Sequence, residues 1–148
     1  MSTSAKSSKR EQSHHRIVEA ASRAVRRHGY AGVGVAEVKK EAGLTHGGFY
    51  AHFDSREALL VEAIEHAGAI SSALLDERIA ARTRETGNPL QALIELYLSD
   101  EHLVHAEHGC VVGALASEIP RQQEMVREAS VQRVDRLVRR VALALPDD

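Results

Sequence analysis

One short segment gathers most of the side chains that could ligate a metal ion. They follow the spacing H-x2-H-x2-H-x-C, and they are His102, His105, His108 and Cys110. Imidazole and thiolate are suitable ligands for zinc or copper. The histidines, however, lie in a polar connection between predicted helices, and neither a second cysteine nor a distant ligand set supports them. We therefore name the three histidines as metal candidates but predict no metal site and no cofactor.

Cys110 carries a second kind of chemistry. It is the only cysteine, which excludes an intramolecular disulfide and is typical of a reducing cytoplasm. It begins a short apolar helix predicted to extend to Ile119, where Pro120 ends or kinks it. A helix N-terminus and nearby histidines favour the thiolate, which reacts with oxidants and electrophiles. Two interpretations stay open: a redox or electrophile sensor, or a small apolar side chain in the core.

Catalytic motifs are missing elsewhere in the sequence. There is no glycine loop for phosphate, no GxSxG turn and no HExxH pair, and the carboxylates are scattered over polar helix faces. We predict that the protein is not an enzyme. Two other classes remain open, namely a DNA-binding protein and a helical protein-interaction module that does not bind DNA.

The elements that would position these side chains are all predicted to be helical. Apolar residues recur at helical spacing and no strand pattern is visible, so the predicted fold class is all-α. Residues 1–8 are predicted to be a flexible tail, and Asp54 or Ser55 is predicted to cap a long helix. No apolar run approaches a membrane span and no secretory signal is visible, so we expect no membrane contact. The predicted helices cover about 9–28, 35–42, 45–53, a stretch from 55, a stretch from 89, 110–119 and 126–145.

Residues 35–53 have the layout of a helix-turn-helix unit, in which the second helix enters the major groove of DNA. Gly43 permits the turn because glycine tolerates a left-handed backbone, and Leu44 anchors it. Thr45 is a natural N-cap for the second helix. Gly47 and Gly48 each weaken that helix by roughly 1 kcal/mol, but they allow a close approach to DNA.

Residues 29–60, GYAGVGVAEVKKEAGLTHGGFYAHFDSREALL, resemble the DNA-binding domain of TetR/AcrR-family transcriptional regulators. The resemblance rests on AGLTHGGFYAHF followed by SREALL, and it implies a domain over residues 9–56. It implies that the Tyr50 hydroxyl binds a phosphate, and that His46 and His52 either contact DNA or are merely solvated. Phe49 and Phe53 are expected in the core. The implied DNA-binding residues are Lys39, Lys40, Thr45, His46, Gly47, Gly48, Tyr50, His52 and Arg56.

The resemblance also implies the rest of the architecture. Residues 57–148 are expected to form a helical regulatory and dimerisation domain that lacks the family's last two helices and is therefore short or truncated. GCVVGALASEIPRQ resembles a GC-x-x-x-ALA-x-E segment of one subgroup. A homodimer would use the helix over residues 126–145, read a palindromic operator in the cytoplasm, and act as a repressor released by an unknown small-molecule effector or a redox signal.

One departure from the family concerns the start of the second helix. Family members often have Thr-Ser there, whereas this chain has Val33 and Gly34. The backbone amides of Val35 and Ala36 would then have to take over the contact with phosphate.

The charge distribution agrees with this division. The chain of 148 residues has a net charge of −2, but residues 1–56 hold ten Lys or Arg against five Asp or Glu. The remaining residues hold nine against sixteen. A basic first third on an acidic body indicates that a polyanion docks at the N-terminal part. Only five residues are aromatic and none is tryptophan, which argues against a site that stacks several bases or sugars.

Overall fold

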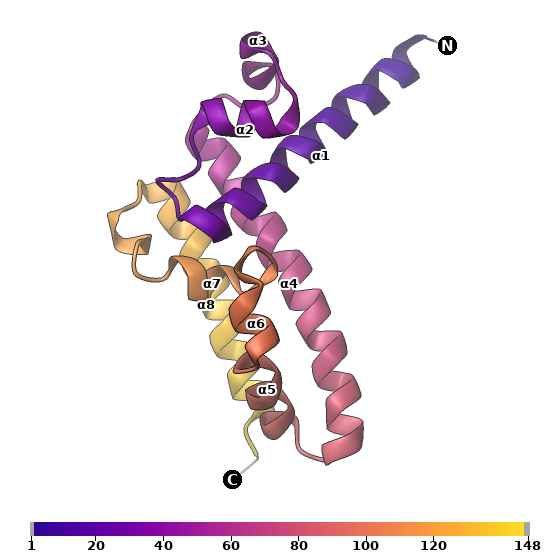
Figure 1. Cartoon of the computed structure of the whole chain (residues 1–148), viewed down its shortest axis with the longest axis vertical. Helices are drawn as coiled ribbons and strands as arrows, with labels where there is room; N and C mark the ends of the chain where they lie inside the picture. Colours follow the sequence, from indigo (N-terminus) through magenta and orange to yellow (C-terminus); the bar gives the residue numbers. More distant parts are fainter. Residues whose placement is uncertain (1, 147–148) are drawn as a thin grey trace.

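The computed structural model describes residues 2–146, and all regular elements in that range are helices (Figure 1). The predicted all-α fold is confirmed. The elements are α1 Ser2–His28, α2 Val35–Ala42, α3 His46–Tyr50, α4 Arg56–Thr86, α5 Pro89–Tyr97, α6 Asp100–Val104, the 3-10 helix η1 Ala106–His108, α7 Val111–Leu115, the 3-10 helix η2 Ile119–Arg121, and α8 Glu124–Ala144.

Helix α4 connects the two ends of the molecule. Helices α1, α2 and α3 form one end, and α5, α6, α7 and α8 pack beside α4 toward the other (Figure 1). The first half of α4 buries the apolar side chains Leu59, Leu60, Ala63, Ile64 and Ala67. One face of this helix therefore belongs to the core that α1 joins from one side and α8 from the other.

The ends of α4 follow from local sequence. The Ser55 side chain accepts a hydrogen bond from the Ala58 amide at 3.0 Å, which confirms Ser55 as the cap. Gly87 ends the helix with φ 71°, a left-handed conformation that favours glycine. Asn88 then caps α5 by accepting from the Gln91 amide, and Pro89 occupies the first helical turn.

In one respect α4 corrects the sequence analysis. Within residues 2–146 it is long and apolar enough to cross a membrane by length and composition alone. Glu62 and Glu65 interrupt the apolar residues of this stretch, so no continuous apolar run is visible in the sequence. A third of this stretch is buried, 33%, mainly through its contacts with α1, α5 and α8.

Other helix bounds differ from the prediction. Helix α1 begins at Ser2 rather than near residue 9, so residues 2–8 continue it as helix. Helix α3 ends at Tyr50 instead of reaching Phe53, which agrees with the low helix propensity of its two glycines. The helix predicted over 110–119 is shorter, because α7 ends at Leu115 and Pro120 lies in the separate turn η2.

A buried hydrogen bond joins the end of α1 to α8. Gly29 ends α1 with φ 72°, and the next residue, Tyr30, is 1% exposed. The hydroxyl oxygens of Tyr30 and Ser130 lie 2.6 Å apart. Ser130 donates its own proton to the carbonyl of Val126, so Tyr30 is the donor in this pair.

We expect Tyr30→Phe to lower the free energy of unfolding by about 1 kcal/mol, because one buried hydrogen bond is lost while the ring remains. Urea denaturation measures this change. Ser130→Ala should cost less in the Tyr30→Phe background than in the wild type. An equal cost in both backgrounds would show that the two hydroxyls do not interact.

Candidate nucleic-acid interface and ligand cavity

The turn between α2 and α3 is built as the sequence predicts. Gly43 has φ 69° and ψ 35°, and its amide donates to the carbonyl of Lys40 at 3.3 Å. The Leu44 amide donates to the Lys39 carbonyl at 2.8 Å, which satisfies a carbonyl at the end of α2. The turn is thus fixed by backbone bonds, and it directs α3 away from α2.

Thr45 occupies the N-cap position of α3, but its side chain makes no capping hydrogen bond. The side chain is exposed at the start of the helix. The predicted position is therefore confirmed, whereas the capping bond is not made. His46 is the first residue of α3, and its side chain lies outside the described residues.

The two phenylalanines fix α3 to the rest of the protein. Phe49 is fully buried and Phe53 is 3% exposed, with their ring centres 5.6 Å apart, so their prediction as core residues is confirmed. Tyr50 lies on the outer side of α3 and is 57% exposed. Its ring and the ring of Phe49 pack edge to face. The Lys39 ammonium lies 5.8 Å from the centre of the Tyr50 ring. This arrangement places an exposed phenol beside a cation.

The glycines of α3 are not needed for packing. A Cβ atom at Gly47 would meet no atom within 4 Å, and one at Gly48 would meet the Thr45 hydroxyl at an ordinary 3.5 Å. Neither residue has a positive φ. Because glycine weakens a helix, the absence of side chains here costs stability without serving the fold. It leaves backbone exposed on the surface beside Tyr50.

Arg56, a predicted phosphate contact, also makes several contacts within the protein. Its Nε donates to the Val33 carbonyl at 2.8 Å, and its terminal nitrogen donates to the Tyr30 carbonyl. A further terminal nitrogen lies 3.9 Å from the Glu57 carboxylate. Three groups of the protein thus surround the guanidinium, which holds the α1–α2 loop against the start of α4. Arg56 therefore positions this loop, and its contact with phosphate stays a prediction.

His52 lies at the edge of the core beside α1. It is half-buried beside His14, with ring centres 5.7 Å apart, and its Nδ1 is buried with no hydrogen-bond partner. His14 stacks on Phe53 and bonds to the Glu62 carboxylate at 2.6 Å. Burial lowers the pKa of His52, and the charges of His14 and Arg10 lower it further. This side chain packs toward α1, and its contact with DNA stays a prediction.

The start of α2 lacks a capping side chain, as the Val33-Gly34 sequence predicts. Gly34 takes the N-cap position in an extended conformation and offers no side-chain cap. The amides of Val35 and Ala36 lie in the first turn, where amides have no acceptor within the helix. A phosphate contact at this point would have to use these backbone groups, as predicted.

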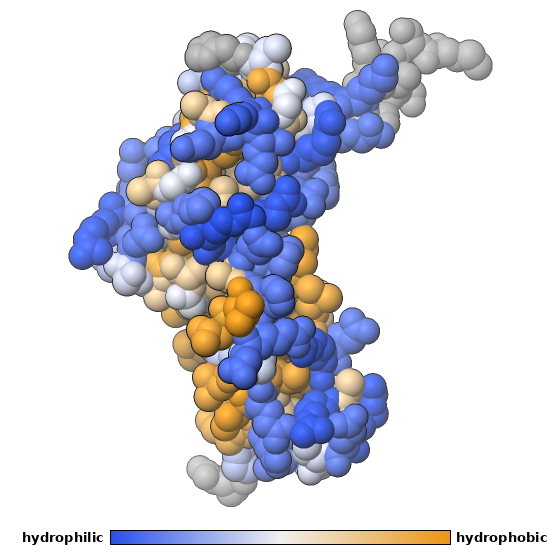
Figure 2. Space-filling model, in the orientation of Figure 1, coloured by the Kyte–Doolittle hydropathy of each residue, from blue (hydrophilic) through white to orange (hydrophobic). Residues whose placement is uncertain are grey.

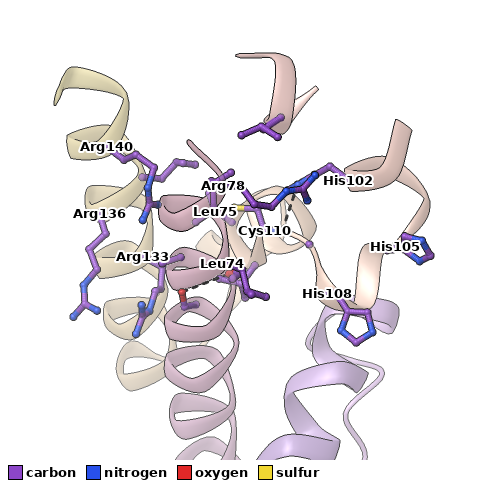
Figure 3. Close-up of a pocket in the computed structure, with 18 of the residues that line it drawn as sticks. Leu74, Leu75, Arg78, His102, His105, His108, Cys110, Arg133, Arg136 and Arg140 are labelled. Carbon is purple, nitrogen blue, oxygen red and sulfur yellow. Dashed lines mark hydrogen bonds between the residues drawn. The ribbon is translucent and has the colours of Figure 1, made fainter. Parts of the chain in front are cut away.

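A cavity of about 520 Å³ lies in the body between α4, α8 and the segment from α6 to α7 (Figure 3). This volume is in the range of small-molecule sites. Its apolar wall is formed by leucines and valines of α4, α5, α7 and α8. Its polar side includes Arg78, Arg133, Arg136, Arg140, His102 and Cys110.

The structure brings Cys110 and His102 together but separates the other two histidines. Cys110 is half-buried at the N-cap of α7, and its amide donates to His102 Nε2 at 3.5 Å. The His102 ring lies 4.7 Å from that of Tyr97, whose pKa is raised by burial and by a hydrogen bond with Cys110. His105 and His108 are exposed and point away from Cys110 (Figure 3). Over residues 2–146, no three potential ligands meet in a metal-binding group.

Two residues of the cavity wall were missed by the sequence analysis, namely Gly68 and Arg133. Gly68 lies in the middle of α4, and the buried Arg133 of α8 passes directly over it. A glycine within an otherwise apolar helical pattern, together with an arginine among the apolar residues of the last helix, is the signal that could have identified this contact.

A short helix, a glycine turn and a second helix fixed by two aromatic rings form a helix-turn-helix unit, here followed by a helical body. Residues 17–63 match the family described as bacterial regulatory proteins, tetR family. The N-terminal unit is therefore similar to the DNA-binding domain of that family, over about a third of the chain.

Individual proteins agree with this assignment. A stretch of 51 residues is 39% identical to YerO of Bacillus subtilis (strain 168), an uncharacterised HTH-type transcriptional regulator. The match covers 34% of this chain and 18% of that regulator.

Solved structures extend the likeness to the body. The structure of the reduced form of E. coli NemR has a TM-score of 0.68 and 22% sequence identity to this chain. The match covers 89% of this chain and 68% of the NemR chain. The structure of a TetR-family transcriptional regulator from Agrobacterium tumefaciens has a TM-score of 0.70 at 21% identity. The match covers 90% of this chain and 74% of that one. The described chain thus has the fold of TetR-family regulators.

The lowered pKa of His52 makes folding sensitive to acid. Because the folded protein holds this ring neutral, its contribution to stability is present above the unfolded pKa of about 6.5 and is lost as pH falls below it. We expect the free energy of unfolding, measured by urea denaturation, to fall less in His52→Gln than in the wild type when the pH is lowered from 7.5 to 5.5. His105→Gln, at an exposed position, is the control. Equal losses in the wild type and His52→Gln would contradict this account.

Proposed function

We propose that this protein is a sequence-specific DNA-binding transcription regulator, most simply a repressor, that reads a palindromic operator as a homodimer in the cytoplasm. The observation that carries the proposal is the outer face of α3. On that face the exposed Tyr50 lies near Gly47. A side chain at position 47 would meet no other atom of the protein, yet the residue is glycine. The absence of that side chain is explained by a surface that approaches this helix closely.

DNA in the major groove is such a surface. In the proposed complex, α3 lies in the groove, and the Tyr50 hydroxyl together with Thr45 at the helix N-terminus faces the phosphates. Lys39 and Lys40, in the last turn of α2, add cationic contacts. The basic N-terminal third provides the longer-range attraction.

The body supplies the surface for a homodimer in this proposal. Large apolar side chains remain exposed on its helices, and Figure 2 shows hydrophobic residues gathered on the lower body, whereas the other end is mostly hydrophilic. On α5 and α8 they are Ile94, Met125, Val131, Val138, Val141 and Leu143. Two copies joined here would present two α3 helices to two half-sites, which are read only at the correct spacing.

Gly47→Ala tests this proposal, because it should move stability and DNA affinity in opposite directions. We expect the free energy of unfolding to rise by up to about 1 kcal/mol. Affinity for a duplex selected from a random pool should fall about tenfold, as for the loss of one specific contact. Gel shifts over a range of salt concentrations measure the affinity, which should fall steeply as salt rises.

Gly113→Ala is the matched control for this experiment. Gly113 lies in α7, and an added Cβ would make only ordinary contacts, the nearest at 3.5 Å. This variant should keep the wild-type affinity for DNA. Failure of the wild type to form a specific complex at any salt concentration would exclude the proposal and favour the helical interaction module.

Cys110 supports the proposal that a redox or electrophile signal acts through the body. Its thiol lies in the cavity wall beside His102 and Tyr97, so a small reagent in the cavity could reach it. A ligand or adduct there would act on α4, which lines the cavity and also begins beside the DNA-binding unit.

We expect a small maleimide to alkylate Cys110 in the native protein and to release the DNA. Mass spectrometry identifies the thioether, and gel shifts measure the release. Cys110→Ser should keep its DNA complex under the same treatment. An unmodified Cys110 in the folded wild type would exclude the sensor hypothesis and leave the thiol as a packing side chain.

A further inference from the structure

The contact between Gly68 and Arg133 is tighter than any side chain at position 68 would allow. A Cβ at Gly68 would lie 2.5 Å from Cδ, 2.7 Å from Nε and 2.8 Å from Cζ of Arg133. Glycine in the middle of a helix is less stable than alanine, so its presence requires a reason. Here the reason is the arginine, whose guanidinium crosses α4 at this point.

Arg133 is held on one side only. One terminal nitrogen donates to the Glu65 carbonyl at 3.0 Å and also to the Glu65 carboxylate. The side chain is 5% exposed, yet its Nε is buried without an acceptor. A buried donor of a charged group that lacks an acceptor is costly, and it is a site where a ligand gains binding energy.

Arg133 lines the 520 Å³ cavity together with Gly68. Figure 3 shows Arg133 and Arg140 between α8 and α4, whereas Arg136 points away from α4. Arg140 is already bound by Asp76 through two bonds of 2.7 and 2.9 Å, and Arg78 donates to Glu101 at 2.7 Å. Among the arginines of this wall, Arg133 therefore offers the buried donor that still needs an acceptor.

The charges around the cavity favour an anion. Four arginines line it against Glu101 and Glu107, and Asp76 and Glu65 pair with three of these arginines from outside the wall. Glu107 is already bound by Arg27 of α1. The rest of the wall is largely apolar, with Leu74, Leu75 and Val112 among its residues. The cavity thus combines a cationic donor at one side with apolar surface at the other.

We propose that this cavity binds a small organic acid, whose carboxylate pairs with the Arg133 guanidinium and whose hydrocarbon part packs on the leucines and valines. This inference deepens the proposed function, on which its regulatory meaning rests. The acid binds where α8 crosses α4, beside the Arg133–Glu65 pair that joins the two helices. Ligand binding therefore acts on the helix that leads to the DNA-binding unit.

Isothermal titration calorimetry with octanoate, octanol and octylamine tests the ligand class, because the three probes share one chain and differ in the head group. We expect octanoate to bind more tightly than either other probe. Equal binding of octanoate and octylamine, or no binding of octanoate, overturns the inference.

Two variants test the role of Arg133. Arg133→Met removes the donor, and Gly68→Ala keeps the charge but forces the guanidinium out of its position. Each should weaken octanoate binding about tenfold or more, as for the loss of a charge-assisted hydrogen bond. Arg127→Met, on an exposed part of α8, is the matched control and should bind like the wild type. Wild-type affinity in both test variants overturns the inference.

If Arg133→Met does not fold by circular dichroism, Arg133→Lys replaces it, because lysine keeps the charge but has no Nε donor. Gel shifts on the same wild-type sample without octanoate separate this inference from the proposed function. A DNA complex without octanoate binding overturns the inference alone. Octanoate binding without a DNA complex overturns the proposed function and supports the cavity assignment.

Discussion

The first half of α4 packs into a single core that both ends of the molecule share. Ile17 and Val25 of α1 and Phe49 of α3 belong to the same buried cluster as Leu115 of α7 and Val126 of α8. The leucines and the isoleucine near the start of α4 lie within that cluster. The predicted domain boundary at residue 56 thus coincides with the first residue of a helix whose side chains are common to both sides.

Two polar contacts reinforce this shared core at the same place. Arg56 binds the carbonyls of Tyr30 and Val33, and Tyr30 in turn donates to Ser130 of α8. The loop between α1 and α2 is therefore held by α4 and by the last helix together. In the proposed regulator, a shift between α4 and α8 at the cavity would reach the DNA-binding unit through this loop as well as through α4 itself.

Local signals in the sequence predicted the helix-turn-helix unit well. Gly43 needs its left-handed backbone, Ser55 caps the helix that follows, and the two phenylalanines recur at helical spacing; each depends on residues a few positions away. The internal contacts of Arg56 and His52 were not predicted. Their partners, Val33 and His14, lie far away in the chain, so a pattern that matches residue types gives no sign of where those side chains point. The contact of Gly68 with Arg133 was missed for the same reason.

The shared core also has a consequence for how the molecule loses its structure. Helices α1, α7 and α8 pack against one stretch of α4, and Phe49 of α3 belongs to the same buried cluster. Loss of packing on one side of this cluster is therefore expected to weaken the other side. A substitution in the body that removes core packing lowers the population of folded DNA-binding units without touching the surface of α3, so a defect in occupancy on DNA can originate entirely in α8.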